Sequence, residues 1–75
     1  MNKILLIDDD RELCILIKQS VLREGIETDC CYSGKSGLLA MKESEYQLVI
    51  LDVMMLGLDG AEYFLLQENL SIYIR

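Results

Sequence analysis

Two short, unbroken apolar runs constrain this chain more than any other feature of its sequence. Residues 4–7 (ILLI) are all apolar, residues 46–51 (YQLVIL) are uncharged and mostly apolar, and an aspartate, Asp8 or Asp52, directly follows each run. Apolar residues at consecutive rather than alternate positions are typical of a strand covered on both faces, as in a parallel sheet. Side chains at the carboxyl ends of such strands build the sites of open α/β folds.

The segment after the first run has the pattern of an amphipathic helix. Residues 11–24 carry apolar side chains at three- and four-residue intervals, and Gly25 is placed to stop the helix as its C′ residue. Asp10 or Asp9 can cap its start, because a carboxylate accepts the unpaired N–H groups of the first turn. The face predicted to pack consists of Leu13, Leu16, Ile17 and Val21, with Ser20 at its margin.

Two further helices are predicted along the chain. Ser33 begins a turn and N-cap that leads into a helix over residues 35–43, whose apolar side is Leu38, Leu39 and Met41. After a loop, Asp59 and Glu62 have the spacing of a capping box, and a third helix should run from there to about residue 69.

The remaining segments complete an alternating order of strands and helices. Residues 26–32 alternate apolar and polar and include two acids, which predicts a strand at the edge of the sheet, and residues 71–74 begin a fourth strand. The order β-α-β-α-β-α-β predicts a single α/β domain with a doubly wound parallel sheet. The two most apolar strands, the first and third, should be neighbours at its centre, with the second strand outside the first.

The composition excludes several classes of protein. Seven Lys and Arg against thirteen Asp and Glu give a net charge of −6, which disfavours nucleic-acid binding by this segment, because that affinity comes mainly from Lys and Arg. The apolar runs fall short of the roughly 20 residues that cross a bilayer, and the first residues do not resemble a signal peptide. Three cysteines without histidine or a C-x-x-C pair argue against zinc. We therefore expect a cytoplasmic domain with buried, reduced thiols.

The predicted topology brings three carboxylates together. If the first and third strands are adjacent and parallel, their carboxyl ends lie about 5 Å apart, and Asp8, Asp9 and Asp52 converge on one small pocket. Carboxylates so close together repel unless a cation lies among them. Oxygen ligands without imidazole or thiolate favour a hard divalent ion, Mg²⁺ above all. A carboxylate beside Mg²⁺ can attack phosphorus and form an aspartyl phosphate.

The residues that carry this chemistry also resemble a known family. Residues 4–10 (ILLIDDD) and 48–60 (LVILDVMMLGLDG) together resemble the receiver domain of two-component response regulators. The resemblance implies a flavodoxin-like fold. It extends over essentially the whole chain but only about the first half, or slightly more, of a complete receiver. Residues 1–75 are therefore expected to be a partial receiver (response regulatory) domain with an incomplete sheet.

The resemblance also implies a role for each acidic residue. Asp52 would accept the phosphoryl group, Asp9 would bind Mg²⁺ directly, and Asp8 would act mainly through water. Met54 would supply its backbone carbonyl as a further metal ligand. The phosphodonor would be a phosphohistidine of a sensor histidine kinase, and the signal would pass to an output domain outside this segment. Such a module is a phosphoacceptor rather than an enzyme.

The sequence departs from the family pattern at several positions. Leu56 occupies a position where the family usually has proline, which we expect to loosen the loop, and Gly37 occupies one where alanine is common, which we expect to cost helix stability only. The Thr or Ser at the end of the fourth strand and the Lys at the end of the fifth, which contact the phosphoryl group in the family, have no counterpart up to Arg75.

Two alternatives follow from the same residues. The first is an interaction fragment that keeps the acidic pocket without phosphoryl transfer and self-associates through an exposed, apolar sheet edge. The second is a phosphatase of the haloacid-dehalogenase type, because residues 8–10 contain D-x-D after a first strand. That reading leaves the loop after Asp52 unexplained, and Glu12 departs from the residues expected after D-x-D.

Overall fold

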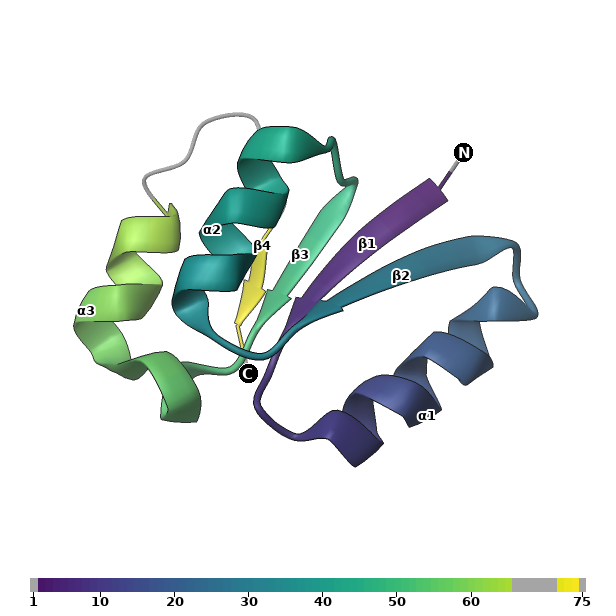
Figure 1. The fold of residues 1–75 in the computed structure, drawn as a ribbon, viewed down its shortest axis with the longest axis horizontal. Helices are drawn as coiled ribbons and strands as arrows, with labels where there is room; N and C mark the ends of the chain where they lie inside the picture. Colours follow the sequence, from purple (N-terminus) through teal and green to yellow (C-terminus); the bar gives the residue numbers. More distant parts are fainter. Residues whose placement is uncertain (1, 66–71, 75) are drawn as a thin grey trace.

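The structure is a computed structural model that describes residues 2–65 and 72–74. Its elements alternate in the predicted order: β1 (Asn2–Ile7), α1 (Arg11–Leu22), β2 (Ile26–Cys31), α2 (Gly34–Glu43), β3 (Leu48–Leu51), α3 (Val53–Leu65) and β4 (Ile72–Ile74). All the strand pairs are parallel, and the order across the sheet is β2-β1-β3-β4 (Figure 1). The predicted central pair, β1 beside β3 with β2 outside β1, is therefore confirmed.

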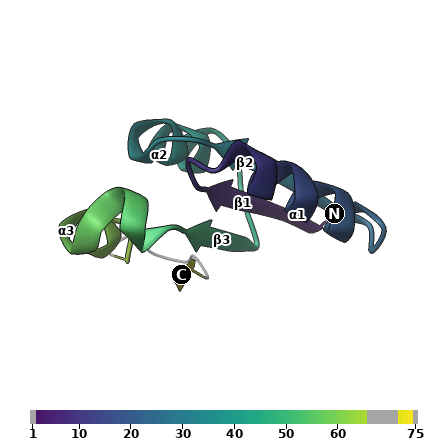
Figure 2. The ribbon, with the colours of Figure 1, turned by 90° about the horizontal axis from the view of Figure 1, so that it is seen from below.

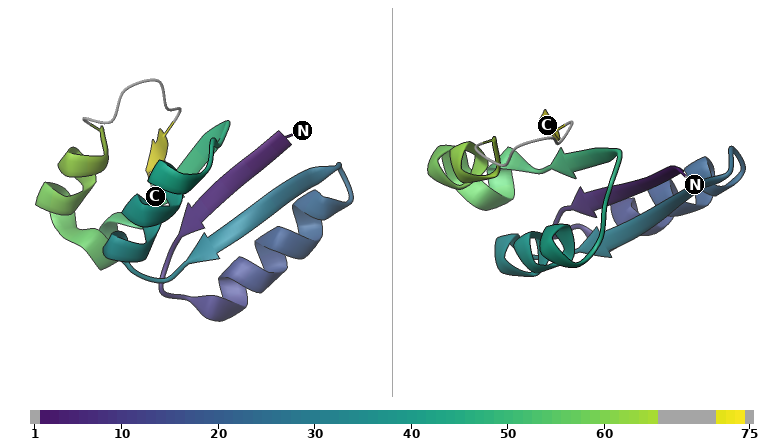
Figure 3. Two further views of the ribbon diagram at one scale, coloured as in Figure 1. Left: turned by 45° about the horizontal axis from the view of Figure 1, so that its top comes forward. Right: turned by 90° about the horizontal axis from the view of Figure 1, so that it is seen from above.

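Helices cover the two faces of this sheet unequally. Helices α2 and α3 lie together on one face, whereas α1 lies on the other side next to β2 (Figure 3). Seen from below, α1 and α3 are at opposite ends of the molecule (Figure 2). The main core lies on the face covered by α2 and α3, and it consists of Leu5, Ile7, Tyr46, Val49, Leu51 and Phe64. This arrangement anchors the strands that carry Asp8 and Asp52.

Helix α1 packs on the sheet with a face that is rotated about the helix axis from the predicted one. Cys14 is its buried residue, and Leu13, Ile17 and Val21 are half-buried, as predicted. Leu16 and Ser20 are wrong as packing residues, because Leu16 is 61% exposed and Ser20 is exposed. Both faces satisfy a helical period, and the packing of the small Cys14 against the sheet selects the one observed. The helix ends earlier than predicted, at Leu22 with Arg23 as its C-cap, and Gly25, with a positive φ of 75°, lies two residues beyond that cap.

The turn after β3 also differs from the prediction. We expected a loop here, but one helical turn begins directly after Asp52, and α3 is then interrupted at Gly57, where φ is 76°. The Asp52 carbonyl accepts hydrogen bonds from the N–H groups of Met55 and Leu56, both at 3.2 Å. A proline at position 56 would lack this donor. The predicted capping box at Asp59 and Glu62 rests on side chains outside the described part, as does a helix end near residue 69.

Helix α2 begins where Ser33 caps it, with a capping box completed by Ser36. Leu38 and Met41 pack on the core as predicted, but Leu39 is wrong, because it is 51% exposed. Gly37 is buried against β1: a Cβ built there would lie 2.8 Å from Cγ1 of Ile7. Its role is therefore a close approach of helix and strand, beyond the helix-propensity cost that we expected.

Candidate functional site at the carboxyl edge of the sheet

The two strand-terminal aspartates are fixed by the sheet itself. The N–H of Asp8 donates to the carbonyl of Cys31 at 3.0 Å, and the N–H of Asp52 donates to the carbonyl of Ile7 at 3.0 Å. Each bond continues a parallel ladder one residue past the end of its strand. The position of both backbones is therefore set by the pairing of β1 with its two neighbours.

The predicted acidic cluster is present at this edge. Asp8, Asp9 and Asp52 each offer a carboxylate oxygen, and these atoms all lie within 4.8 Å of one another. Asp8 is buried, with 1% of its surface exposed, Asp52 is half-buried and Asp9 is exposed. The cluster thus has an inner and an outer side, and a ligand would enter past Asp9.

Local hydrogen bonds orient two of these carboxylates. Oδ1 of Asp8 accepts from the N–H of Asp10 at 2.9 Å, and Oδ1 of Asp52 accepts from the N–H of Met54 at 2.9 Å. Oδ1 of Asp10 itself accepts from the N–H of Leu13 at 3.0 Å, so Asp10 is the N-cap of α1, as predicted. Asp10 therefore belongs to the helix start and lies outside the acidic cluster.

The donor set fits a small, hard divalent cation. All three donors are carboxylate oxygens, which Mg²⁺ prefers to softer ligands. Ligands on opposite sides of Mg²⁺ are about 4.2 Å apart, since each lies about 2.1 Å from the ion. The carboxylate oxygens of the cluster lie within 4.8 Å of one another, which is close to this largest distance between two ligands of one Mg²⁺ ion. The exposed side of the cluster leaves room for the waters that Mg²⁺ usually retains.

Met54 and Cys14 each contact an aspartate of the cluster, Met54 from the exposed side and Cys14 from the buried side. The Met54 residue is 92% exposed and its N–H binds Asp52, whereas the ligand role of its carbonyl stays a prediction. Cys14 is buried, as expected of the thiols, but sequence reasoning missed its contact with the site: its thiol donates to the backbone carbonyl of Asp8 at 3.8 Å. The helical spacing of Cys14 with Ile17 and Val21 is the signal that would have placed it against the sheet.

A doubly wound parallel sheet with a carboxylate cluster at the ends of its two central strands defines a flavodoxin-like domain with an acidic site. The family model for the response regulator receiver domain matches residues 4–70. The chain therefore belongs to the receiver domains of two-component systems, which are signalling modules. The interpretation as a haloacid-dehalogenase-type phosphatase is set aside by this match.

Curated relatives are whole response regulators. The chain is 37% identical over 60 residues to the transcriptional regulatory protein PcoR of Escherichia coli, an alignment that spans 80% of this chain and 26% of PcoR. It is 44% identical over 62 residues to a CpxR homolog of Haemophilus influenzae, spanning 83% of this chain and 27% of the relative. The chain thus matches about a quarter of the length of these relatives.

Solved receiver structures share the fold over almost the whole chain. The response regulator TrrA in complex with the histidine kinase ThkA is 31% identical, with a TM-score of 0.81 over 99% of this chain and 67% of that one. TrrA from Thermotoga maritima in complex with Mg²⁺-BeF is 32% identical, with a TM-score of 0.79 over 96% of this chain and 66% of that one. These likenesses confirm the predicted fold class.

Proposed function

We propose that Asp52 accepts a phosphoryl group from the phosphohistidine of a sensor kinase, in a site where Asp8, Asp9, Asp52 and the backbone carbonyl of Met54 hold Mg²⁺. The observation that carries the proposal is the convergence of three carboxylates within 4.8 Å at the carboxyl ends of β1 and β3. A phosphorelay receiver needs a nucleophilic carboxylate beside a metal-binding pair, and the three carboxylates of this cluster are enough for both roles.

Each residue has a separate task in this proposal. A carboxylate oxygen of Asp52 forms the new bond to phosphorus while the nitrogen–phosphorus bond of the donor breaks, and the electron pair leaves with the imidazole nitrogen. The Met54 N–H holds Oδ1 of Asp52 and so fixes the plane of the attacking group. Asp8, oriented by Asp10, and Asp9 hold the metal. Bound Mg²⁺ would neutralise the charge of the transferring phosphoryl group.

The relatives support the partners that we propose. One similar structure is a complex of a response regulator with a histidine kinase, and another is a complex with Mg²⁺-BeF. We propose the same class of kinase and the same metal for this chain. Since the chain spans about two thirds of these receivers and a quarter of the transcriptional regulators, we also propose that residues 1–75 are part of a receiver that signals to an output domain in the cytoplasm.

Intact mass spectrometry tests the proposal directly. The chain is incubated with Mg²⁺ and acetyl phosphate, a small acyl phosphate, beside Asp52→Asn and a control variant, Glu24→Gln, which changes an exposed acid just beyond α1. We expect one phosphoryl adduct on the wild type and on the control. The adduct should be lost in Asp52→Asn and when EDTA removes the metal.

Circular dichroism of the same samples makes the result decisive. A folded wild type that gains no adduct would contradict phosphoryl transfer by this segment, as would an adduct that persists in Asp52→Asn. A folded Asp8→Asn variant should show the adduct only at much higher Mg²⁺ concentration, because it removes a charge that helps to hold the metal and leaves the nucleophile in place.

A further inference from the structure

The proposed phosphoryl chemistry does not use the cysteines, two of which meet between α1 and β2. The thiol of Cys30 donates to the backbone carbonyl of Cys14 at 3.9 Å. Burial, and after it the neighbouring Cys30 thiol, raise the pKa of the Cys14 thiol to about 12. Helix and strand therefore approach closely enough at this point for one sulfur to reach the backbone of the other residue.

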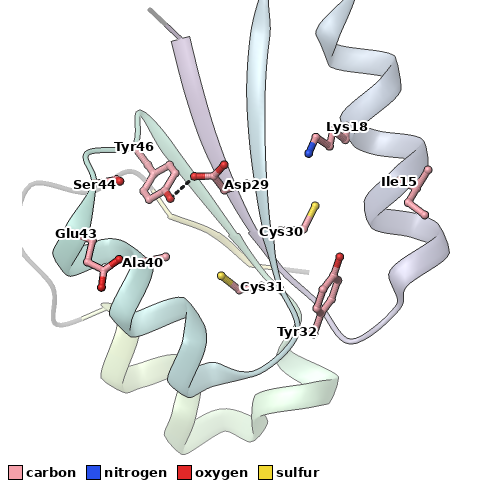
Figure 4. Close-up of a pocket in the computed structure, with 10 residues that line it drawn as sticks. All are labelled: Ile15, Lys18, Asp29, Cys30, Cys31, Tyr32, Ala40, Glu43, Ser44 and Tyr46. Carbon is pink, nitrogen blue, oxygen red and sulfur yellow. Dashed lines mark hydrogen bonds between the residues drawn. The ribbon is translucent and has the colours of Figure 1, made fainter.

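Cys31 is separated from this pair by the strand itself. Successive side chains of a strand point to opposite faces, and Figure 4 shows Cys30 and Cys31 on opposite sides of β2. Cys31 donates to the carbonyl of Ser36 at 3.5 Å and packs against the core under α2. Of the three cysteines, only Cys14 and Cys30 share the α1 side of the sheet.

The pair also has an entrance from solvent. A cavity of about 490 Å³ lies beside β2, between α1 and α2, and Cys30 and Cys31 both line it, together with Ile15, Lys18 and Tyr32 (Figure 4). Cys30 is half-buried, whereas Cys14 is fully buried. A small oxidant that enters this cavity meets Cys30 and Cys31 but not Cys14, and of these two cysteines only Cys30 lies on the α1 side of the sheet with Cys14.

We propose that Cys14 and Cys30 form a redox-sensitive dithiol, which a hydroperoxide converts into an intramolecular disulfide between α1 and β2. The sulfur of Cys30 attacks the peroxide, the O–O bond breaks, and Cys30 becomes a sulfenic acid with release of water. The sulfur of Cys14 then displaces the sulfenic oxygen, which leaves as a second water molecule. In sum, two thiols are oxidised and one hydrogen peroxide is reduced to two waters.

The disulfide changes a contact at the acidic site. In the dithiol form the Cys14 S–H donates to the carbonyl of Asp8. The disulfide has no hydrogen to donate, and it also fixes the first turns of α1 to β2. Oxidation would therefore alter the support of Asp8. The formation of the disulfide itself is independent of the phosphoryl chemistry proposed above.

Disulfide mapping of the wild-type chain tests the proposal. The reduced protein is treated with hydrogen peroxide at low protein concentration, remaining thiols are alkylated, and the peptides are identified by mass spectrometry without reduction. We expect a monomer lighter by two hydrogens, a cross-link between Cys14 and Cys30, and an alkylated Cys31. The same treatment in concentrated urea should give a mixture of cross-links, including Cys14 with Cys31.

Variants provide the matched controls. Cys31→Ser should form the disulfide as the wild type does, whereas Cys30→Ser should retain alkylatable Cys14. The proposal is overturned if native and urea-treated samples give the same mixture. It is equally overturned if the native product is a disulfide-linked dimer, or if peroxide takes Cys30 to the sulfinic acid while Cys14 stays reduced.

Discussion

Tyr46 shows how one side chain can link the stability of this fold to pH. Its ring is buried, and its hydroxyl donates to Oδ2 of Asp29 at 2.6 Å. Burial first, and then the neighbouring Asp29 carboxylate, raise the pKa of the Tyr46 phenol from 10.0 to about 12. The amine of Lys3 lies 3.4 Å from the same carboxylate oxygen. The three side chains join β1, β2 and the segment before β3.

We predict a loss of stability at alkaline pH from this residue. A phenol whose pKa is higher in the folded state keeps its proton better there. Its contribution is therefore complete below pH 10.0 and disappears as the pH rises to about 12. The free energy of unfolding should fall by about 2–3 kcal/mol over this range. Urea unfolding at a series of pH values measures the fall.

Tyr46→Phe isolates this effect from other alkaline titrations, such as that of Cys14, whose pKa is also raised to about 12. The variant lacks the titrating hydroxyl, so its free energy of unfolding should decline less steeply above pH 10. It should also be less stable at neutral pH, since it loses the bond to Asp29. Parallel alkaline curves for the two proteins would contradict the prediction.

At the scale of elements, the approach of α2 to β1 depends on Gly37. Three side-chain atoms of the fully buried Ile7 lie within 3.3 Å of a Cβ built at this position. Gly37→Ala gains up to about 1 kcal/mol of helix propensity but overpacks the core, which costs about 1–3 kcal/mol. We predict a net loss of stability, measured by urea unfolding followed by circular dichroism.

Two further variants separate packing from helix propensity. Ile7→Val removes the δ carbon that meets the new methyl group, so the double variant Gly37→Ala with Ile7→Val should recover part of the loss. Lys35→Ala, on the exposed face of α2, should change the free energy of unfolding by less than about 0.5 kcal/mol. If Gly37→Ala alone proves more stable than the wild type, α2 can move away from β1 at little cost.

For the whole molecule, the sheet ends at β4 in the part of the chain that the structure describes. The sequence of β4 is apolar, Ile72–Ile74, and an apolar strand with one open side is a template for another chain. We predict that the 75-residue chain self-associates through this edge. Light scattering should show a molar mass that rises with concentration.

A charge at each sheet edge tests which one is responsible. Ile72→Lys should lower the association, because a lysine discourages pairing between strand edges. The matched change at the opposite edge, Glu27→Lys in β2, replaces an exposed residue and should leave the association as it is. A wild type that stays monomeric at all concentrations and melts sharply would contradict self-association.

The order and pairing of strands could be predicted from sequence because the apolar runs of β1 and β3 and the acids of β2 differ so clearly. The meeting of Asp8, Asp9 and Asp52 followed from that pairing. The rotation of α1 and the exposure of Leu39 could not be predicted from sequence. Helical periodicity is compatible with more than one buried face, and packing against the sheet determines which face is buried. The helical turn after Asp52 depends on hydrogen bonds to that residue, which an apolar pattern does not encode.

The central position of β1 has a consequence for the synthesis of this protein. β1 is synthesised before its central neighbour β3, since its partner Leu48 follows Ile4 by 44 residues. At about 5–20 residues per second, Leu48 is made roughly 2–9 seconds after Ile4, and β2, which ends at Cys31, becomes available to β1 only part-way through this interval. The acidic cluster cannot assemble before Asp52 has emerged. Nascent chains shorter than this should therefore present an unfinished apolar strand to chaperones, and Mg²⁺ binding should begin only once β3 has paired.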